Sequence, residues 1–145
     1  MPKLLLLPIL ALFLCFSAPL HAQTVAVGTI KSLSGNVTIL RATPVTAQVG
    51  DKLAANDVIQ VDAGSVGMTF QDGTRVSLGP KTRFEISEFE FDPVEGKLGM
   101  LLRLISGKLQ YISGRISELA PDSVKVETPV ATVGVRGTRF VVEAR

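Results

Sequence analysis

The sequence predicts an all-β fold, a single compact domain of short, mostly antiparallel strands. From Val25 onward, β-branched residues alternate with polar ones, and Gly, Asp-Gly or Pro interrupts these runs at short intervals. After residue 23 the sequence requires no long helix and contains no linker or low-complexity tract. Residues 23–145 are therefore predicted to form one domain, either a rolled two-layer sheet or sandwich or a short solenoid-like stack.

Residues 1–22 are predicted to be a signal peptide that is cleaved on export. Lys3 precedes an apolar run from Leu4 to Phe16, and small residues follow that run. The run is shorter than the roughly 20 apolar residues that a membrane-spanning helix needs. Cleavage after Ala22 is therefore expected, with no stable membrane insertion afterwards. The protein is expected to be periplasmic or secreted.

Cleavage at this point would remove the chain's only cysteine, Cys15, and its only histidine, His21. A chain without a thiol or an imidazole cannot form a disulfide, a thiolate zinc site or a Ser-His-Asp triad. We therefore predict that the protein is not an enzyme and has no catalytic residues, no metal site and no cofactor.

The charge composition gives no strongly basic field. The chain contains 15 Lys and Arg residues against 13 Asp and Glu residues, and loss of Lys3 reduces that excess to one. Nucleic-acid binders usually have a strongly basic surface, so no nucleic-acid partner is expected. The charges are interpreted as a mixed, solvated surface.

The first half of the domain is predicted to consist of strands joined by short turns. Residues 25–40 read as two strands around a turn at Ser34-Gly35-Asn36. Turn formers at Gly50-Asp51 and Asn56-Asp57 then lead into a strand over 58–61, because short Asn and Asp side chains bond the local backbone.

A hairpin is predicted around Asp72-Gly73, because alternating runs flank this dipeptide. Pairing Phe70 with Val76 across a three-residue loop, Asp72 to Thr74, would keep the apolar faces of both strands together. A two-residue loop would instead place Phe70 opposite Arg75. Further along, the apolar positions change parity, which predicts a bulge near Ser87-Glu88.

Residues 98–119 fit two interpretations. Their apolar spacing alone is typical of an amphipathic helix. However, Gly107 and Gly114 would then lie in the helix interior at a cost of about 1 kcal/mol each. We favour two strands broken at Ser106-Gly107 and at most one short helical turn near 113–119. Three further strands are predicted from Ser123 to the end.

Several short motifs follow one another in a definite order along the domain. It consists of the VGD turn with Leu53 and Asp57, the Asp72-Gly73 loop, the Ser-Gly pairs at 106–107 and 113–114, and Thr128-Pro129 with Arg136-Gly137-Thr138. In this order the motifs resemble the FecR-like domain, the periplasmic sensor region of iron-dicitrate-type cell-surface signalling regulators. The resemblance covers nearly all of residues 23–145.

This resemblance implies an all-β periplasmic module that reports or holds a contact with another protein. Full regulators of that family also carry a cytoplasmic segment, a membrane helix and a receptor-contacting domain. The sequence is expected to be a stand-alone, exported version without them, so direct control of transcription is not carried over.

The candidate binding residues lie in the final stretch, ETPVATVGVRGTRFVVEAR. Gly134 and Gly137 bracket Val135-Arg136, which is typical of a tight turn or a close backbone approach. Arg136 either locks this turn by donating to carbonyls or a carboxylate of a neighbouring strand, or presents donors together with Arg139 to an anionic ligand or an acidic partner. A third interpretation is a solvated pair with no special role.

We expect a non-enzymatic binding or scaffold module that contacts an envelope protein of unknown identity in cell-envelope signalling or organisation. Exposed edge strands would dock the partner through strand addition. Two alternatives stay open: a calcium-binding or hydrolytic site among the carboxylates of EISEFEFDPVEG, and a cell-wall or adhesion module. Against the first, alternating Glu residues usually mark the solvated face of a strand.

Overall fold

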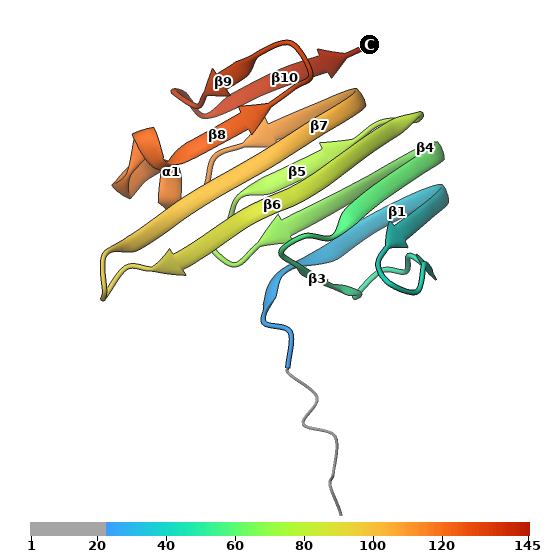
Figure 1. The fold of residues 1–145 in the computed structure, drawn as a ribbon, viewed down its shortest axis with the longest axis horizontal. Helices are drawn as coiled ribbons and strands as arrows, with labels where there is room; N and C mark the ends of the chain where they lie inside the picture. The colour runs from blue at the N-terminus through green and yellow to red at the C-terminus, as the bar shows by residue number, and fades with distance from the viewer. Residues whose placement is uncertain (1–22) are drawn as a thin grey trace, which may run out of the picture.

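The computed structural model describes residues 23–145, and the predicted signal peptide lies outside them. Ten strands form one rolled sheet (Figure 1), with β1–β3 at one side and β8–β10 and the only α-helix of the described residues at the other. The strands are β1 (Ala26–Leu40), β2 (Val45–Thr46), β3 (Lys52–Ala54), β4 (Val58–Phe70), β5 (Arg75–Leu78), β6 (Thr82–Asp92), β7 (Lys97–Ile112), β8 (Val124–Glu127), β9 (Thr132–Gly134) and β10 (Arg139–Ala144). The helix α1 (Arg115–Leu119) and the 3-10 turn η1 (Pro121–Ser123) connect β7 to β8.

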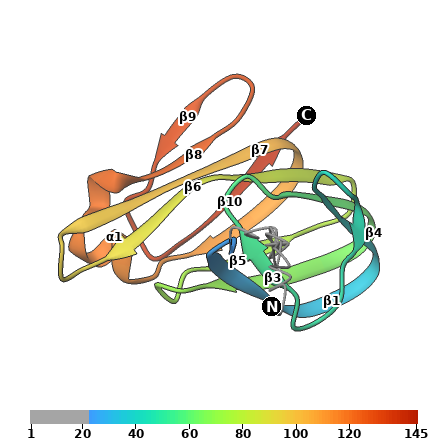
Figure 2. The same ribbon diagram turned by 60° about the horizontal axis from the view of Figure 1, so that its bottom comes forward.

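The sheet folds over into two layers, and the three long strands β1, β4 and β7 take part in both. Layer 1 has the strand order β3-β1-β4-β5-β7-β10. Layer 2 has the order β2-β1-β4-β6-β7-β8-β9. All neighbours are antiparallel except β7 and β8. Figure 2 shows β1 and β4 curving round one end of the molecule. The predicted all-β, two-layer architecture is confirmed.

Glycines bend the long strands where they pass between the layers. Gly35 of β1 and Gly64 of β4 are register partners with φ angles of +78° and +91°. An added Cβ on Gly64 would lie 2.5 Å from the Ser34 carbonyl carbon and overlap its oxygen. Gly107 of β7 has a φ of +94°. The predicted turn at Ser34-Gly35-Asn36 and the predicted break at Ser106-Gly107 are therefore wrong, because left-handed glycines bend continuous strands there instead of ending them.

The hairpin at Asp72-Gly73 is present, but its pairing differs from the prediction by two residues. Met68, not Phe70, lies opposite Val76. The Phe70 N–H donates to the Thr74 carbonyl oxygen at 2.8 Å, so the three-residue loop is 71–73. Thr74 lies directly before β5, and its own N–H and hydroxyl both donate to the buried Asp72 carboxylate. The apolar faces stay together as expected.

Most other predictions for the second half of the domain are confirmed. The pairing of β6 with β7 shifts between Ile86 and Glu88, where a bulge was expected. Residues 98–119 form the single strand β7 and then the short helix α1, so strand is correct in place of a long helix, but the predicted division into two strands is not, and η1 adds a second helical turn. The three strands after Ser123 are β8, β9 and β10.

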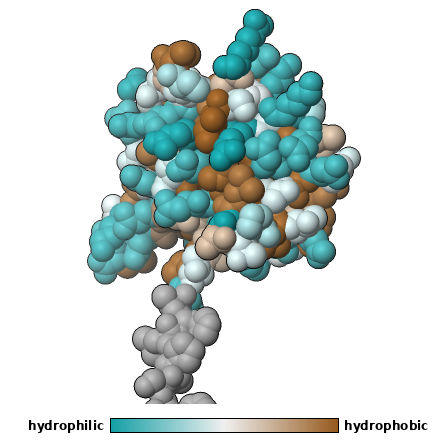
Figure 3. Space-filling view, turned by 45° about the vertical axis from the view of Figure 1, so that its right-hand side comes forward, coloured by the Kyte–Doolittle hydropathy of each residue, from teal (hydrophilic) through white to brown (hydrophobic). Residues whose placement is uncertain are grey.

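The hydrophobic core fills the space between the layers. In β4, β5, β6 and β8, alternate residues point inward over most of the strand, as the period of two along a strand requires. Tyr111 and Phe84 are among the largest fully buried side chains. The Tyr111 ring stacks on Phe140 of β10 at 4.8 Å between centroids. On the side of the molecule shown in Figure 3, hydrophilic side chains border a band of apolar ones. No helix within residues 23–145 has the length and hydrophobicity that a membrane crossing requires.

Candidate functional site

The corner at residues 134–138, between β9 and β10, is held in place by its backbone. The Ser113 N–H donates to the Thr138 carbonyl oxygen at 2.9 Å, and the Ser113 hydroxyl donates to the Gly137 carbonyl oxygen at 2.5 Å. Gly137 has a φ of +129°, and Val135 is buried in the core. The corner is therefore a fixed support from which the side chain of Arg136 projects.

A groove of about 570 Å³ lies between this corner and the segment of α1 and η1. Its lining includes charged side chains of both signs beside apolar surface. The lining residues are Ser113, Ser117, Glu118, Pro121, Asp122, Val135, Arg136, Gly137 and Thr138. We call it the corner groove.

Arg136 lies at the corner groove with its guanidinium 3.4 Å from the Asp122 carboxylate. The two side chains are 84% and 87% exposed. An ion pair this exposed contributes little to stability. Arg136 thus contacts a carboxylate, as one interpretation expected, but this carboxylate belongs to η1 and not to a neighbouring strand. The turn is fixed by Ser113 and Val135 and not by Arg136. The guanidinium remains accessible to a binding partner.

Arg139, the other predicted binding residue, does not line the corner groove. It is the first residue of β10, lies opposite Ile112 of β7 and is exposed on the outer face of layer 1. Within residues 23–145 it has no ion-pair partner. The structure therefore places the two predicted residues on different surfaces.

The buried carboxylate of Asp72 positions α1 beside the corner groove. It accepts hydrogen bonds from the Thr74 hydroxyl at 2.7 Å and from the Ile116 N–H at 3.2 Å, and the Asp72 carbonyl oxygen accepts the Arg115 N–H at 2.8 Å. An added Cβ on Gly114 would overlap the backbone nitrogen of Thr74, so this close approach requires glycine. The sequence analysis predicted only a turn at Asp72. The Asp-Gly-Thr order was the feature that could have indicated a hydrogen-bonded carboxylate there.

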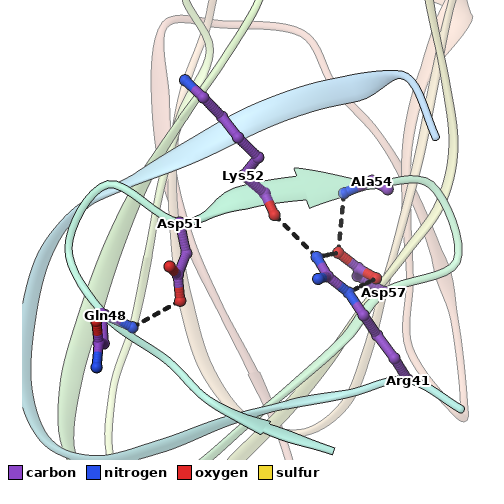
Figure 4. Close-up of polar contacts among 6 residues, drawn as sticks. All are labelled: Arg41, Gln48, Asp51, Lys52, Ala54 and Asp57. Carbon is purple, nitrogen blue, oxygen red and sulfur yellow. Dashed lines mark hydrogen bonds and ion pairs between the residues drawn. The ribbon is translucent and has the colours of Figure 1, made fainter. Parts of the chain in front are cut away.

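A second polar cluster joins the segment after β1 to the start of β4 (Figure 4). The Arg41 guanidinium donates to both carboxylate oxygens of Asp57, at 2.8 and 2.6 Å, and to the Lys52 carbonyl oxygen at 2.8 Å. Asp57 is buried and also accepts the Ala54 N–H at 2.8 Å. Its hydrogen bond raises the pKa of Arg41 above the ordinary value, although burial opposes this. This cluster satisfies its own polar atoms, which is the pattern of a structural lock.

The family comparison covers most of the elements described above. A family model described as FecR protein matches residues 57–145, which run from Asp57 through the corner groove to the end of β10. The chain belongs to the FecR family. FecR domains are regulatory signalling domains that are generally associated with the cell envelope and are not known as enzymes. Neither a curated protein nor a solved structure matches the chain.

In this FecR protein the carboxylates considered for a calcium site are dispersed. Glu85 pairs with Arg103 at 3.5 Å, and the same arginine contacts Glu127 at 3.1 Å. Within residues 23–145, no three His, Cys, Asp or Glu side chains are grouped so that they could hold a metal ion. The geometry therefore gives the calcium-binding alternative no support.

Tyr111 should make the stability of this FecR protein fall at alkaline pH. Burial raises the pKa of its phenol above the ordinary 10.0, whereas the hydrogen bond with Ser117 acts in the opposite direction. The unfolded chain therefore loses the proton first. As pH rises above about 10, the free energy of unfolding should decrease by up to about 1.4 kcal/mol per pH unit, until the folded form also ionises.

Urea unfolding between about pH 8 and about pH 11, a range that spans the ordinary tyrosine pKa, would measure this loss. Tyr111 is the only tyrosine and the chain has no tryptophan, so tyrosinate absorbance reports its ionisation directly. Tyr111→Phe is the control and should flatten the decrease. An equal decrease in both proteins would show that other groups cause it.

Proposed function

We propose that this FecR-family protein is a non-enzymatic, periplasmic binding module that contacts another envelope protein through the corner groove. The observation that carries the proposal is an arginine, Arg136, that is 84% exposed on a backbone fixed by Ser113 and Val135. A rigid support lowers the entropy that a charged side chain loses on binding. Arginine is also enriched among the residues that dominate protein–protein binding energies.

The chemistry of the corner groove suits a peptide segment with an acidic side chain. Arg136 offers a planar pair of donors to a carboxylate, and the hydroxyls of Ser117 and Thr138 can bond peptide groups. Glu118 and Asp122 on the opposite wall would disfavour a uniformly acidic ligand. This combination favours a peptide of mixed charge over a small anion.

The position of the corner also suits strand addition. It connects β9, the edge strand of layer 2, to β10, the edge strand of layer 1. Each of these strands pairs with one neighbour and leaves its other edge open. An extended partner segment anchored at Arg136 could therefore continue along an open strand edge. Arg139, at the start of β10, would flank such a segment.

Site-specific photo-crosslinking in cells tests the proposal. A crosslinking residue in place of Thr138 should capture an envelope protein, whereas one in place of the exposed Val49, between β2 and β3 at the other side of the sheet, should not. Arg136→Glu should reduce capture from position 138 by about tenfold or more, because it reverses the anchoring charge. Arg136→Lys should retain part of it.

Two results would contradict the proposal. One is equal capture from positions 138 and 49, and the other is capture from position 138 that is unchanged by Arg136→Glu. Melting temperatures of the variants show whether they fold, and the exposed position of Arg136 makes a large change unexpected.

A further inference from the structure

The outer face of layer 1 carries a marked excess of positive charge. Alternation along β10, β7, β5, β4, β1 and β3 brings five exposed cations and one exposed anion to this face within the described residues. The cations are Lys31, Lys52, Arg75, Lys108 and Arg139, and the anion is Glu143. We call this surface the basic face. The chain as a whole has a net charge of only +2, so the excess is local.

The strand register arranges these cations across the whole width of the layer. One cross-strand row runs through the paired residues of six strands, in the order Arg139, Ile112, Arg75, Thr69, Thr29 and Lys52. With neighbouring strands about 4.8 Å apart, the row is about 24 Å long. Lys31 and Lys52 also border a hollow of about 220 Å³ at one end of the row.

Most of this charge is not neutralised within the protein. Lys108 pairs with Glu143 at a long 3.8 Å, and the Lys52 ammonium donates to the Thr29 hydroxyl at 3.2 Å. Figure 4 shows the Lys52 side chain pointing away from the Arg41–Asp57 pair. Within residues 23–145, Lys31 and Arg75 have no ion-pair partner. By contrast, Arg103 on the outer face of layer 2 is held by two glutamates.

Small polar groups occupy the surface between the cations. Ser32 of β1 and Ser77 of β5 face each other across Gly67 of β4, where an added Cβ would overlap the Ser32 hydroxyl. Gln110 of β7 lies next in this second row. The centre of the basic face therefore carries small side chains, and hydroxyl and amide groups are exposed there. Its one exposed large apolar residue among those described is Val141, at the edge.

We propose that the basic face binds an acidic polysaccharide. Carboxylates along an extended sugar chain would meet lysine and arginine side chains spaced across the layer, and its hydroxyls would bond Ser, Thr and Gln side chains between them. The face offers no aromatic ring on which bases could stack, which disfavours single-stranded nucleic acid. Its one exposed large apolar side chain among the described residues, Val141, lies at the edge, which disfavours insertion into a lipid surface.

The test is a titration of the purified protein with fluorescently labelled oligogalacturonate, followed by anisotropy. Binding is expected, and its affinity should fall steeply with salt, since it rests on exposed charges. The triple variant Lys31→Gln, Arg75→Gln, Lys108→Gln should bind about tenfold more weakly or worse. The matched control Arg83→Gln, Lys97→Gln, Lys125→Gln removes the same charge from exposed positions outside the basic face and should stay within about twofold.

Several outcomes would overturn the proposal. They are the absence of binding at low salt, an equal loss in both triple variants, equal binding of neutral dextran, and tighter binding of single-stranded DNA or of vesicles containing phosphatidylglycerol. Thermal unfolding verifies that each variant folds. Arg136→Glu should leave oligogalacturonate binding intact, so failure here and failure of the proposed protein contact are separable.

Discussion

Gly64→Ala is expected to destabilise the protein by about 3–4 kcal/mol. Two effects act together at this position. The residue has a φ of +91°, which an L-residue with a side chain rarely adopts, and the new Cβ would overlap the Ser34 carbonyl. The partner strand also has a glycine here, Gly35, whose own Cα would lie 2.9 Å from that Cβ. The three atoms nearest to that Cβ all belong to the backbone, so the clash is not relieved by moving a side chain.

Urea unfolding of the wild-type and variant proteins measures this effect. The matched control is Gly50→Ala, because Gly50 has a similar φ of +94° but nothing within 4 Å of its added Cβ. This control isolates backbone strain, and a loss of about 1 kcal/mol is expected. If both substitutions cost the same, the close approach of β1 and β4 is not what requires glycine at position 64.

Arg41→Ala is expected to cost about 2–4 kcal/mol, because it leaves the buried Asp57 carboxylate without its cationic partner. Asp57 would keep only the hydrogen bond from the Ala54 N–H. The Asp57 side chain is 6% exposed and the Arg41 side chain 38%. The carboxylate, not the arginine, therefore bears most of the penalty for losing the pair.

Chemical unfolding of three further variants tests this explanation. Arg41→Lys keeps the charge but not the bidentate geometry, and should recover part of the loss. Combining Arg41→Ala with Asp57→Ala should cost less than the sum of the single changes, because the uncompensated buried charge disappears. Arg103→Ala removes an arginine from an exposed network and should cost about 1 kcal/mol or less. If Arg41→Ala and Arg103→Ala reduce the free energy of unfolding by similar amounts, burial of the Asp57 carboxylate is not the cause.

The strands and core faces were predictable because they depend on local alternation. The apolar positions around Asp72-Gly73 indicated the inward face of β4 and β5, and the parity change at Ser87 indicated the bulge. Gly35 and Gly107 misled the prediction for a physical reason. A glycine with positive φ is needed both at a turn and at a bend, and for β1 the difference depends on Gly64, a partner that is remote in sequence.

The candidate site was predictable only in part. The bracketing glycines marked the corner around Arg136, but the corner groove depends on α1, which Asp72 holds from a distant hairpin. The pair of Arg41 and Asp57 likewise forms across 16 positions of the chain. The basic face depends on the register of six strands, so a nearly balanced composition concealed it.

The long strands have a consequence for how the protein responds to a load. Because β1, β4 and β7 each run through both layers, neither layer can detach while the other stays intact. We therefore expect the domain to unfold as one unit, without a separable subdomain. A force that a bound partner exerts on the corner would pass through β10 to β7, and from β7 to the strands of both layers.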